Sequence, residues 1–185
     1  GGSVVLMSHL GRPKDGYEAK FSMANILAEV SKLIGVEVKF ATACIGTETK
    51  NQAQQLKPGE VLLLENLRFY KQETLGDEDF AKQLAELGNV YINDAFGTAH
   101  RAHASTAIIA NFFPNEKMFG YLIEQEILSV DKVLKAGQSP VTAIVGGAKV
   151  SSKIVILEQL MEQVGNIIIG GGMAYTFVKA LGGST

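Results

Sequence analysis

The chain has 185 residues, of which 46% are hydrophobic and 19% charged, a composition that excludes disordered and fibrous proteins. Its net charge of −2 provides no broad positive field, so we expect no nucleic-acid partner. The length exceeds the commonest size of a single domain and favours one domain plus part of another.

The sequence also carries signals about the cellular setting. Cys44 is the only cysteine, so no internal disulfide can form, and we expect a buried thiol in a reduced, cytoplasmic protein. No apolar run approaches the ~20 residues that span a bilayer, so no membrane contact is expected. The opening Gly-Gly-Ser-Val lacks the charged segment of a signal peptide and an initiating Met, and it does not resemble a natural start.

Apolar runs alternate with helical repeats along the first part of the chain, which predicts a parallel sheet with helical crossovers. Ser22 and Asp77 are the expected N-caps of two helices, and Gly35 and Gly88 follow their ends. The predicted elements are strands at 3–8, 36–40, 61–64 and 90–93, with helices at 23–34, 48–56 and 77–87.

The alternation weakens after Ser105 and resumes in the last third of the chain. A loop at 111–115 is expected to close the first domain, and an amphipathic helix at 121–134 to connect it to the next. The elements expected beyond it are a strand at 141–145, a helix ending near 164, a strand at 167–169 and a helix from 174. We therefore predict an α/β protein of doubly wound, Rossmann-like parallel sheets, with domains at 1–119 and 138–185 and an interdomain helix at 120–137.

Three predicted strands each run directly into a basic segment. His9 and Arg12 follow the first, Arg68 follows the third, and Arg101 lies in the loop after the fourth. Ligands of open α/β sheets collect at the carboxyl ends of the strands, and guanidinium groups bind phosphate or carboxylate through paired hydrogen bonds. For any single arginine a surface ion pair is the better interpretation, whereas three at equivalent strand ends favour an anion site.

The loop with Arg101 allows other interpretations. Arg101 could pair with Asp94 while His100 and His103 pack or face solvent, and the loop alone does not decide between this and anion binding. The two histidines are spaced i, i+3, but no Cys or Glu is placed to complete a metal site. We expect no metal ligands. The Asp-Ala-Phe-Gly run from Asp94 is not a protein-kinase signature, because the extra residue and the missing companion motifs remove its context.

Two glycine turns follow the strands of the second domain. Gly146-Gly-Ala-Lys149 precedes a helix, an arrangement that directs backbone N–H groups and a cation at a phosphate, although it is not a Walker A loop. Lys149 and Lys153 are expected to share a helix face, where two like charges favour a bound anion. The run Gly170-Gly-Gly172 does not match the Gly-x-Gly-x-x-Gly motif of dinucleotide-binding proteins, because Tyr175 occupies the position of the third glycine.

Together these stretches resemble phosphoglycerate kinases. The motifs that carry the resemblance, in chain order, are Ser-His-Leu-Gly-Arg-Pro from Ser8, Leu-Leu-Glu-Asn-Leu-Arg-Phe from Leu63, Asn-Asp-Ala-Phe-Gly-Thr-Ala-His-Arg-Ala-His from Asn93, Gly-Gly-Ala-Lys-Val-Ser-Ser-Lys from Gly146 and Ile-Gly-Gly-Gly-Met-Ala from Ile169. The resemblance implies reversible phosphoryl transfer between 1,3-bisphosphoglycerate and ADP, with Mg²⁺, giving 3-phosphoglycerate and ATP in glycolysis. The alternative is a non-catalytic module that binds a phosphorylated metabolite.

The resemblance also implies roles for individual residues. Those expected to bind the triose substrate are His9, Leu10, Gly11, Arg12, Arg68 and Arg101, with Arg12 and Arg101 also catalytic. Those expected to bind ATP or ADP are Gly147, Ala148, Lys149, Lys153, Gly171 and Gly172, with Lys149 facing the phosphoryl group in transfer. The family often has an acidic residue where this chain has Ser152.

The resemblance covers only part of a phosphoglycerate kinase. The family's Arg-x-Asp-x-Asn substrate segment lies before the first motif, and its late glycine-rich loop and acidic metal partner lie beyond the last, so neither is in this sequence. We expect the isolated 185 residues to be inactive, the Mg²⁺ ligands to lie elsewhere, and the complete protein to be a monomer.

Overall fold

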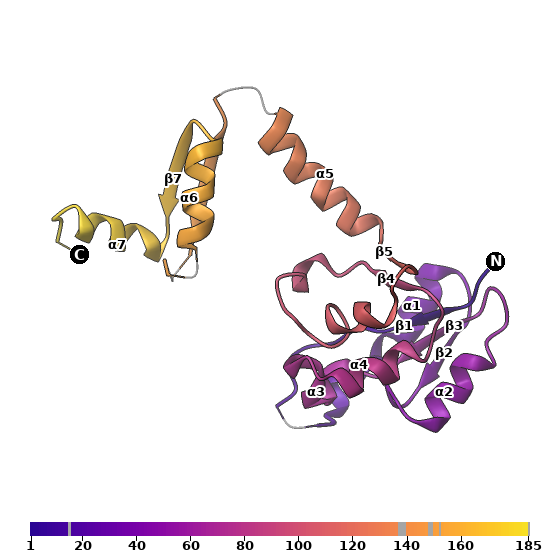
Figure 1. Cartoon of the computed structure of the whole chain (residues 1–185). Helices are drawn as coiled ribbons and strands as arrows, with labels where there is room; N and C mark the ends of the chain where they lie inside the picture. The colour runs from indigo at the N-terminus through magenta and orange to yellow at the C-terminus, as the bar shows by residue number, and fades with distance from the viewer. Residues whose placement is uncertain (15, 137–139, 148–149, 152, 185) are drawn as a thin grey trace. The chain divides into compact units, whose positions relative to one another are not determined.

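The computed structural model describes residues 1–14, 16–136, 140–147, 150–151 and 153–184, without the side chains of residues 133–136. The chain divides into two compact units, Gly1–Ile123 and Glu124–Thr185 (Figure 1). Each unit contains parallel strands joined through helices, so the predicted α/β class is confirmed. Ala148, Lys149 and Ser152, which the sequence singled out, lie outside the described residues.

The first unit contains two parallel sheets. Strands β1 (Val4–Leu6), β2 (Val38–Ala41) and β3 (Val61–Leu64) form the first in the order β1-β3-β2, with Val61 aligned with both Val4 and Val38. Strands β4 (Tyr91–Asn93) and β5 (Lys117–Phe119) form the second. Because β3 lies between two strands, its amide and carbonyl groups are paired on both edges.

Helices and short 3₁₀ turns connect these strands. The side chain of Asp77 accepts a hydrogen bond from Phe80 N at 2.8 Å and begins a helix, as the sequence predicted. Gly35 ends another helix with φ of 80°, a conformation that favours glycine. The helices are α1 (Leu27–Ile34), α2 (Thr47–Gln54), α3 (Lys71–Leu75) and α4 (Glu78–Ala85), and the 3₁₀ turns are η1 (Ala19–Phe21), η2 (Met23–Ile26), η3 (Leu67–Phe69), η4 (Phe96–Thr98) and η5 (Ile108–Phe112).

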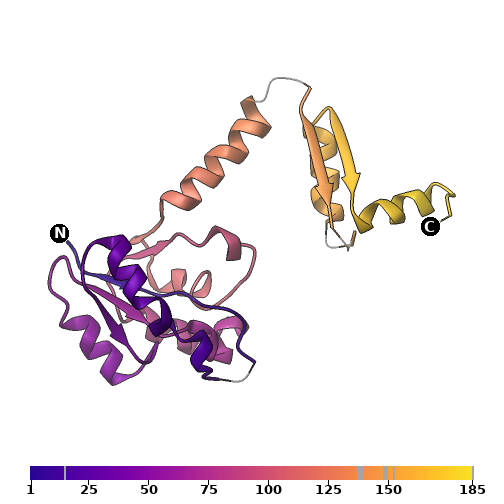
Figure 2. The same cartoon turned by 180° about the vertical axis from the view of Figure 1, so that it is seen from behind.

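The core of the first unit lies on both faces of β3, all four of whose residues are buried. Leu62 and Leu64 belong to a cluster that includes Phe80 of α4 and Ala53 of α2. The alternate residues of β3 belong to a second cluster with Met23, against which α1 packs. Figures 1 and 2 show α4 and α1 on opposite sides of the sheet. Helices therefore cover both faces, which is the doubly wound arrangement.

Cys44 is fully buried beside this core, as predicted. Its thiol donates a hydrogen bond to the carbonyl oxygen of Glu65 at 2.8 Å, and its amide donates to the hydroxyl of Tyr70. Burial and the nearby carboxylates of Glu65 and Glu73 raise the pKa of the Cys44 thiol. The cysteine therefore acts as a packing residue that stays protonated.

Three predictions for this unit were wrong in detail. The first strand is shorter than 3–8, and it is an edge strand whose first residue, Val4, is 45% exposed. The helix expected at 23–34 begins as the 3₁₀ turn η2, which Ser22 caps through a bond from Ala24 N. Strand β5 was not predicted, because the hydrophobic pattern after residue 111 is weak and the three residues of β5 are all exposed.

The second unit continues the alternation. Its elements are α5 (Tyr121–Ala136), which crosses the division between the units, β6 (Thr142–Gly146), α6 (Ile154–Gln163), β7 (Asn166–Gly170) and α7 (Gly172–Ala180). Strands β6 and β7 pair in parallel, and Leu157 and Met173 are buried. Within the described residues, no helix combines the length and the apolar character that a bilayer span requires.

Candidate functional site

The loop after β1 is held to the segment after β3 by direct bonds. Leu67 N donates to the carbonyl oxygen of Ser8 at 3.1 Å, and Asn66 Nδ2 donates to that of Leu10 at 2.7 Å. Gly11 has φ of +64°, and a Cβ atom there would collide with the ring of Phe21. The glycine thus lets the loop approach the 3₁₀ turns that follow it.

Two buried residues that the sequence analysis assigned no role organise this junction. Glu65 accepts hydrogen bonds from Ser22 Oγ at 2.6 Å and from the amides of Met23 and Asn66 at 2.7 Å each. Asn66, fully buried, also donates to Phe21 O and accepts from the amide of Arg68 at 2.9 Å. Both belong to the Leu-Leu-Glu-Asn-Leu-Arg motif, and two polar residues directly after an all-apolar strand were the signal for them.

Arg68 lies on η3, partly buried, and its Nη1 donates to the carbonyl oxygen of Gly11 at 3.1 Å. Burial first, and then the charges of Arg101 and Arg12, lower the pKa of Arg68, whereas Glu73 opposes this shift. An arginine stays protonated despite such a shift. Arg12 and Arg101 therefore each lie close enough to Arg68 for their charges to affect it, and the three arginines come from three separate segments of the chain.

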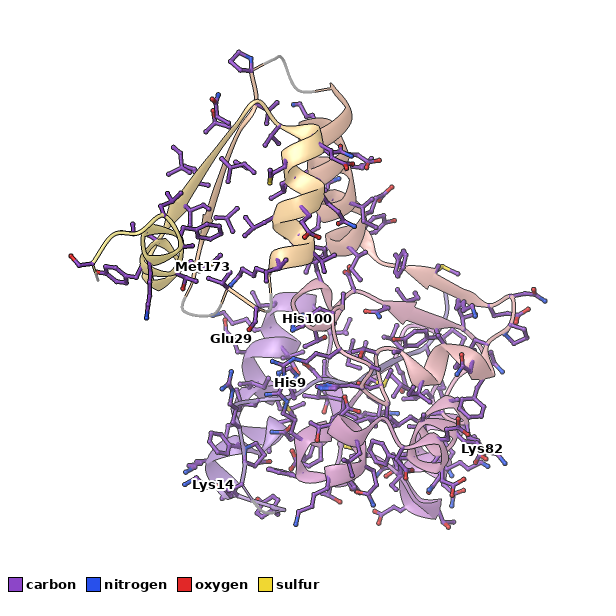
Figure 3. The ribbon with its side chains drawn as sticks, turned by 60° about the vertical axis from the view of Figure 1, so that its left-hand side comes forward. His9, Lys14, Glu29, Lys82, His100 and Met173 are labelled. Atoms are coloured by element: carbon purple, nitrogen blue, oxygen red, sulfur yellow. The ribbon has the colours of Figure 1, made fainter. Side chains whose placement is uncertain are left out.

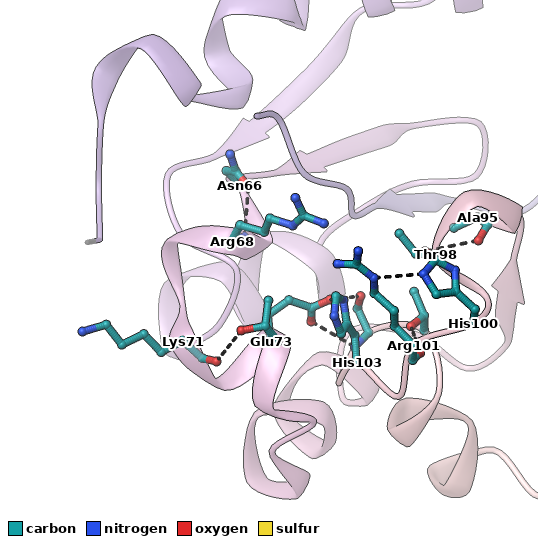
Figure 4. A network of polar contacts seen from close by, with 12 residues as sticks. Asn66, Arg68, Lys71, Glu73, Ala95, Thr98, His100, Arg101 and His103 are labelled. Carbon is teal, nitrogen blue, oxygen red and sulfur yellow. Dashed lines mark hydrogen bonds and ion pairs between the residues drawn. The ribbon is translucent and has the colours of Figure 1, made fainter. Parts of the chain in front are cut away.

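The loop after β4 carries Arg101 at its exposed surface. Arg101 Nε donates to His100 Nε2 at 3.2 Å (Figure 4). Asp94 accepts a hydrogen bond from the amide of Ile123 at 3.0 Å, and among the ion pairs of the described residues none joins Asp94 to Arg101. The alternative in which Arg101 is neutralised by Asp94 is therefore wrong.

His9 completes a group of basic residues, which we call the basic cluster: His9, Arg12, Arg68 and Arg101. Burial lowers the pKa of His9, and the charges of Arg68, His103 and Arg101 lower it further. His9 is therefore neutral near pH 7. Basic residues from three segments of the chain thus act on one another electrostatically, which favours a multiply charged anion among them.

We expect sulfate, which stays a dianion between pH 5 and 8, to raise the pKa of His9. A bound dianion offsets the positive field of Arg68 and Arg101 that now disfavours the imidazolium. NMR titrations of the imidazole signals in sulfate and in chloride at equal ionic strength measure the shift, and His9→Gln assigns the signal. By the same linkage, sulfate affinity should rise as the pH falls through the pKa of His9. Identical titration curves in the two salts would contradict anion binding at this cluster.

The second unit brings the two glycine turns together. Met173 N donates to the carbonyl oxygen of Gly147 at 2.8 Å, and a Cβ atom on Gly171 would lie 3.3 Å from the amide nitrogen of Gly147. The Nζ atom of Lys153 would lie 2.6 Å from a Cβ atom on Gly147, so the lysine side chain reaches the first turn. Gly172 is the first residue of α7. The predicted nucleotide-site residues that the structure describes therefore lie close together.

One prediction about these lysines was wrong. Helix α6 begins at Ile154, so Lys153 precedes the helix as its N-cap and does not lie one turn inside it. Lys149, the other member of the predicted pair, lies outside the described residues. The cationic side chain instead occupies the start of a helix, where it accompanies the unpaired N–H groups of the first turn.

The whole chain matches the family model described as phosphoglycerate kinase, over residues 1–185. It is 49% identical to the phosphoglycerate kinase of Porphyromonas gingivalis, covering 99% of this chain and 49% of that protein. It is 52% identical to that of Chlorobium phaeovibrioides, covering 98% and 46%.

Solved structures agree. The phosphoglycerate kinase of Coxiella burnetii superposes with a TM-score of 0.78 at 39% identity, covering 98% of this chain and 45% of that one. That of Pyrococcus horikoshii gives 0.77 at 29% identity, covering 97% and 46%. The chain thus spans about half the length of the relatives it matches.

Proposed function

Because the chain belongs to the phosphoglycerate kinase family, we propose that the protein transfers a phosphoryl group reversibly between 1,3-bisphosphoglycerate and ADP. In the reverse direction, a carboxylate oxygen of 3-phosphoglycerate attacks the γ-phosphorus of ATP, and the bond from that phosphorus to ADP breaks. The reaction needs alignment and charge stabilisation and no covalent enzyme intermediate. The acceptor is therefore a carboxyl group.

The observation that carries the proposal is the basic cluster. His9, Arg12, Arg68 and Arg101 would hold the non-transferred phosphate of the triose, with Leu10 and Gly11 lining the loop. Several charge-assisted hydrogen bonds are needed because a phosphate dianion loses hydration when it binds. Arg12 and Arg101 would also stabilise charge during transfer.

The glycine turns of the second unit would hold the nucleotide. Lys153 and the adjacent backbone of Gly147, Gly171 and Gly172 support this assignment through their closeness. We carry over Ala148 and Lys149 from the family motif alone, with Lys149 facing the phosphoryl group in transfer. The residues proposed for the triose and those proposed for the nucleotide thus belong to different units.

Magnesium accompanies ATP in this proposal, and we propose that its protein ligands lie elsewhere than in the described residues. They contain no group of three or more His, Cys, Asp or Glu side chains placed to hold a metal ion. We therefore assign no step of the reaction to the metal through this part of the chain. Because the chain spans about half the length of its relatives, we also propose that these 185 residues alone lack turnover. The complete protein would act as a cytoplasmic monomer.

Turnover of the complete protein with 3-phosphoglycerate and MgATP tests the proposal. Lys153→Ala should raise the KM for ATP about 10-fold, because a lost hydrogen bond to a charged group costs roughly 1.5–3 kcal/mol, and should leave the KM for 3-phosphoglycerate unchanged. Lys149→Ala should instead lower kcat more than it changes nucleotide affinity. Saturable binding of 3-phosphoglycerate without any turnover would contradict the kinase and favour the non-catalytic binding module.

A further inference from the structure

A buried carboxylate beneath the basic cluster has no part in the mechanism above. Glu73 lies on the five-residue helix α3, which directly follows η3 and Arg68, and only 4% of its surface is exposed. Its Oε1 accepts a hydrogen bond from Ser105 Oγ at 2.6 Å, and its Oε2 accepts one from the amide of Ser105 at 3.0 Å. His103 Nδ1 lies 3.7 Å from Oε1 (Figure 4).

The backbone of the same helix also receives the loop that carries Arg101. The carbonyl oxygen of Glu73 accepts a hydrogen bond from Ala104 N at 2.9 Å. Gly76, which ends α3 with φ of +68°, lies so close to the carbonyl oxygen of Ala102 that a Cβ atom would collide with it. Residues 102–105 are therefore held against α3 by the side chain and the carbonyl group of Glu73 and by the close approach that Gly76 permits.

Glu73 is linked to the cluster on its other side as well. Its charge opposes the lowering of the pKa of Arg68 that burial and the other arginines cause. The carboxylate thus lies near the segments of both Arg68 and Arg101, whose like charges repel each other. A buried carboxylate is costly unless it is paired and hydrogen-bonded, and here its partners are the loop of Arg101.

We propose that Glu73 is a positioning residue that holds the loop of Arg101 and His103 against α3, so that Arg101 stays opposite Arg68 without a bound anion. Glu73 touches no substrate in this role, and the inference rests on the proposed triose-phosphate site. Preorganisation of this kind lowers the ordering cost of binding, so its loss should weaken affinity for the phosphate ester and leave nucleotide binding unchanged.

Three variants of the complete protein separate this role from mere stability. Glu73→Ala removes the acceptors of Ser105, and we expect the KM for 3-phosphoglycerate to rise about 5-fold with the KM for ATP unchanged. Glu73→Gln retains an oxygen for the Ser105 amide and an NH₂ group for its hydroxyl, so it should restore most of the affinity. Ser105→Ala removes one of the two bonds and should raise the KM about 2- to 3-fold even where Glu73→Ala fails to fold.

Leu84→Val is the matched control, because Leu84 is buried in the same core on α4 and has no bond to the loop. It should lower Tm without changing the KM for 3-phosphoglycerate. Amide exchange at Ala104 and Ser105 provides a readout that needs no substrate, and it should accelerate in Glu73→Ala and Ser105→Ala alone.

Unchanged KM values in both Glu73→Ala and Ser105→Ala, or an equal rise in Leu84→Val, would overturn the inference. A wild-type protein without binding or turnover of 3-phosphoglycerate would refute the proposed function instead. Amide exchange would then decide the inference. Exchange at Ala104 and at position 105 that is no faster in Glu73→Ala and Ser105→Ala than in the wild type would overturn it.

Discussion

Replacing Arg68 with alanine in the complete protein should raise the KM for 3-phosphoglycerate by about 10-fold or more, since a lost charge-assisted hydrogen bond costs roughly 1.5–3 kcal/mol. Arg68 is partly buried among Arg12 and Arg101, where water screens its charge less than at an open surface. Its loss also frees the carbonyl oxygen of Gly11, to which Arg68 Nη1 donates. Steady-state kinetics with varied 3-phosphoglycerate at saturating MgATP measure the effect.

Two comparisons make the Arg68 result specific. Arg68→Lys keeps a positive charge but loses the planar fork that binds phosphate bidentately, so its KM should lie between wild type and Arg68→Ala. Lys82→Ala removes an exposed cation on α4, and Figure 3 shows Lys82 well apart from His9 in the basic cluster. If Arg68→Ala leaves the KM for 3-phosphoglycerate unchanged, or if Lys82→Ala raises it equally, the basic cluster does not bind the triose.

Replacing Phe80 with alanine should lower the free energy of unfolding of the first unit by about 3–5 kcal/mol, the cost typical of deleting a buried aromatic ring. Phe80 is 2% exposed, packs with Leu62 and Leu64 of the central strand, and lies 5.1 Å from the Tyr70 ring between centroids. Because domains are stable by only roughly 5–15 kcal/mol, the loss is a large share of the total. Urea unfolding of the chain, followed by circular dichroism, measures it.

Leu75 is the matched control for Phe80, because it lies on the neighbouring helix α3 but is 79% exposed. Leu75→Ala should change the unfolding free energy by less than about 0.5 kcal/mol, as is usual for surface substitutions. An unfolding midpoint that is the same in Phe80→Ala and wild type would mean that α4 is not part of the cooperative core.

The regular elements followed from local pattern where the pattern was strong. The four apolar residues Val61–Leu64 form the strand that was predicted, because an uninterrupted apolar run suits a strand buried on both faces. Asp77 and Gly35 were identified as caps because their chemistry is local. Strand β5 was not predicted because Lys117–Phe119 shows no alternation of buried and exposed residues. Its pairing with β4 is a contact between segments distant in sequence.

For the candidate site, the sequence alone identified the basic residues His9, Arg12, Arg68 and Arg101 and placed each of them after a predicted strand. Residue type and strand direction suffice for that. Only the tertiary structure showed that Glu65 and Glu73 are buried hydrogen-bond acceptors, because a glutamate in a sequence usually indicates a solvated surface. Their partners are remote: Ser22 lies 43 residues from Glu65, and Ser105 lies 32 residues from Glu73. Such bonds form only when separate segments meet, and therefore no local pattern predicts them.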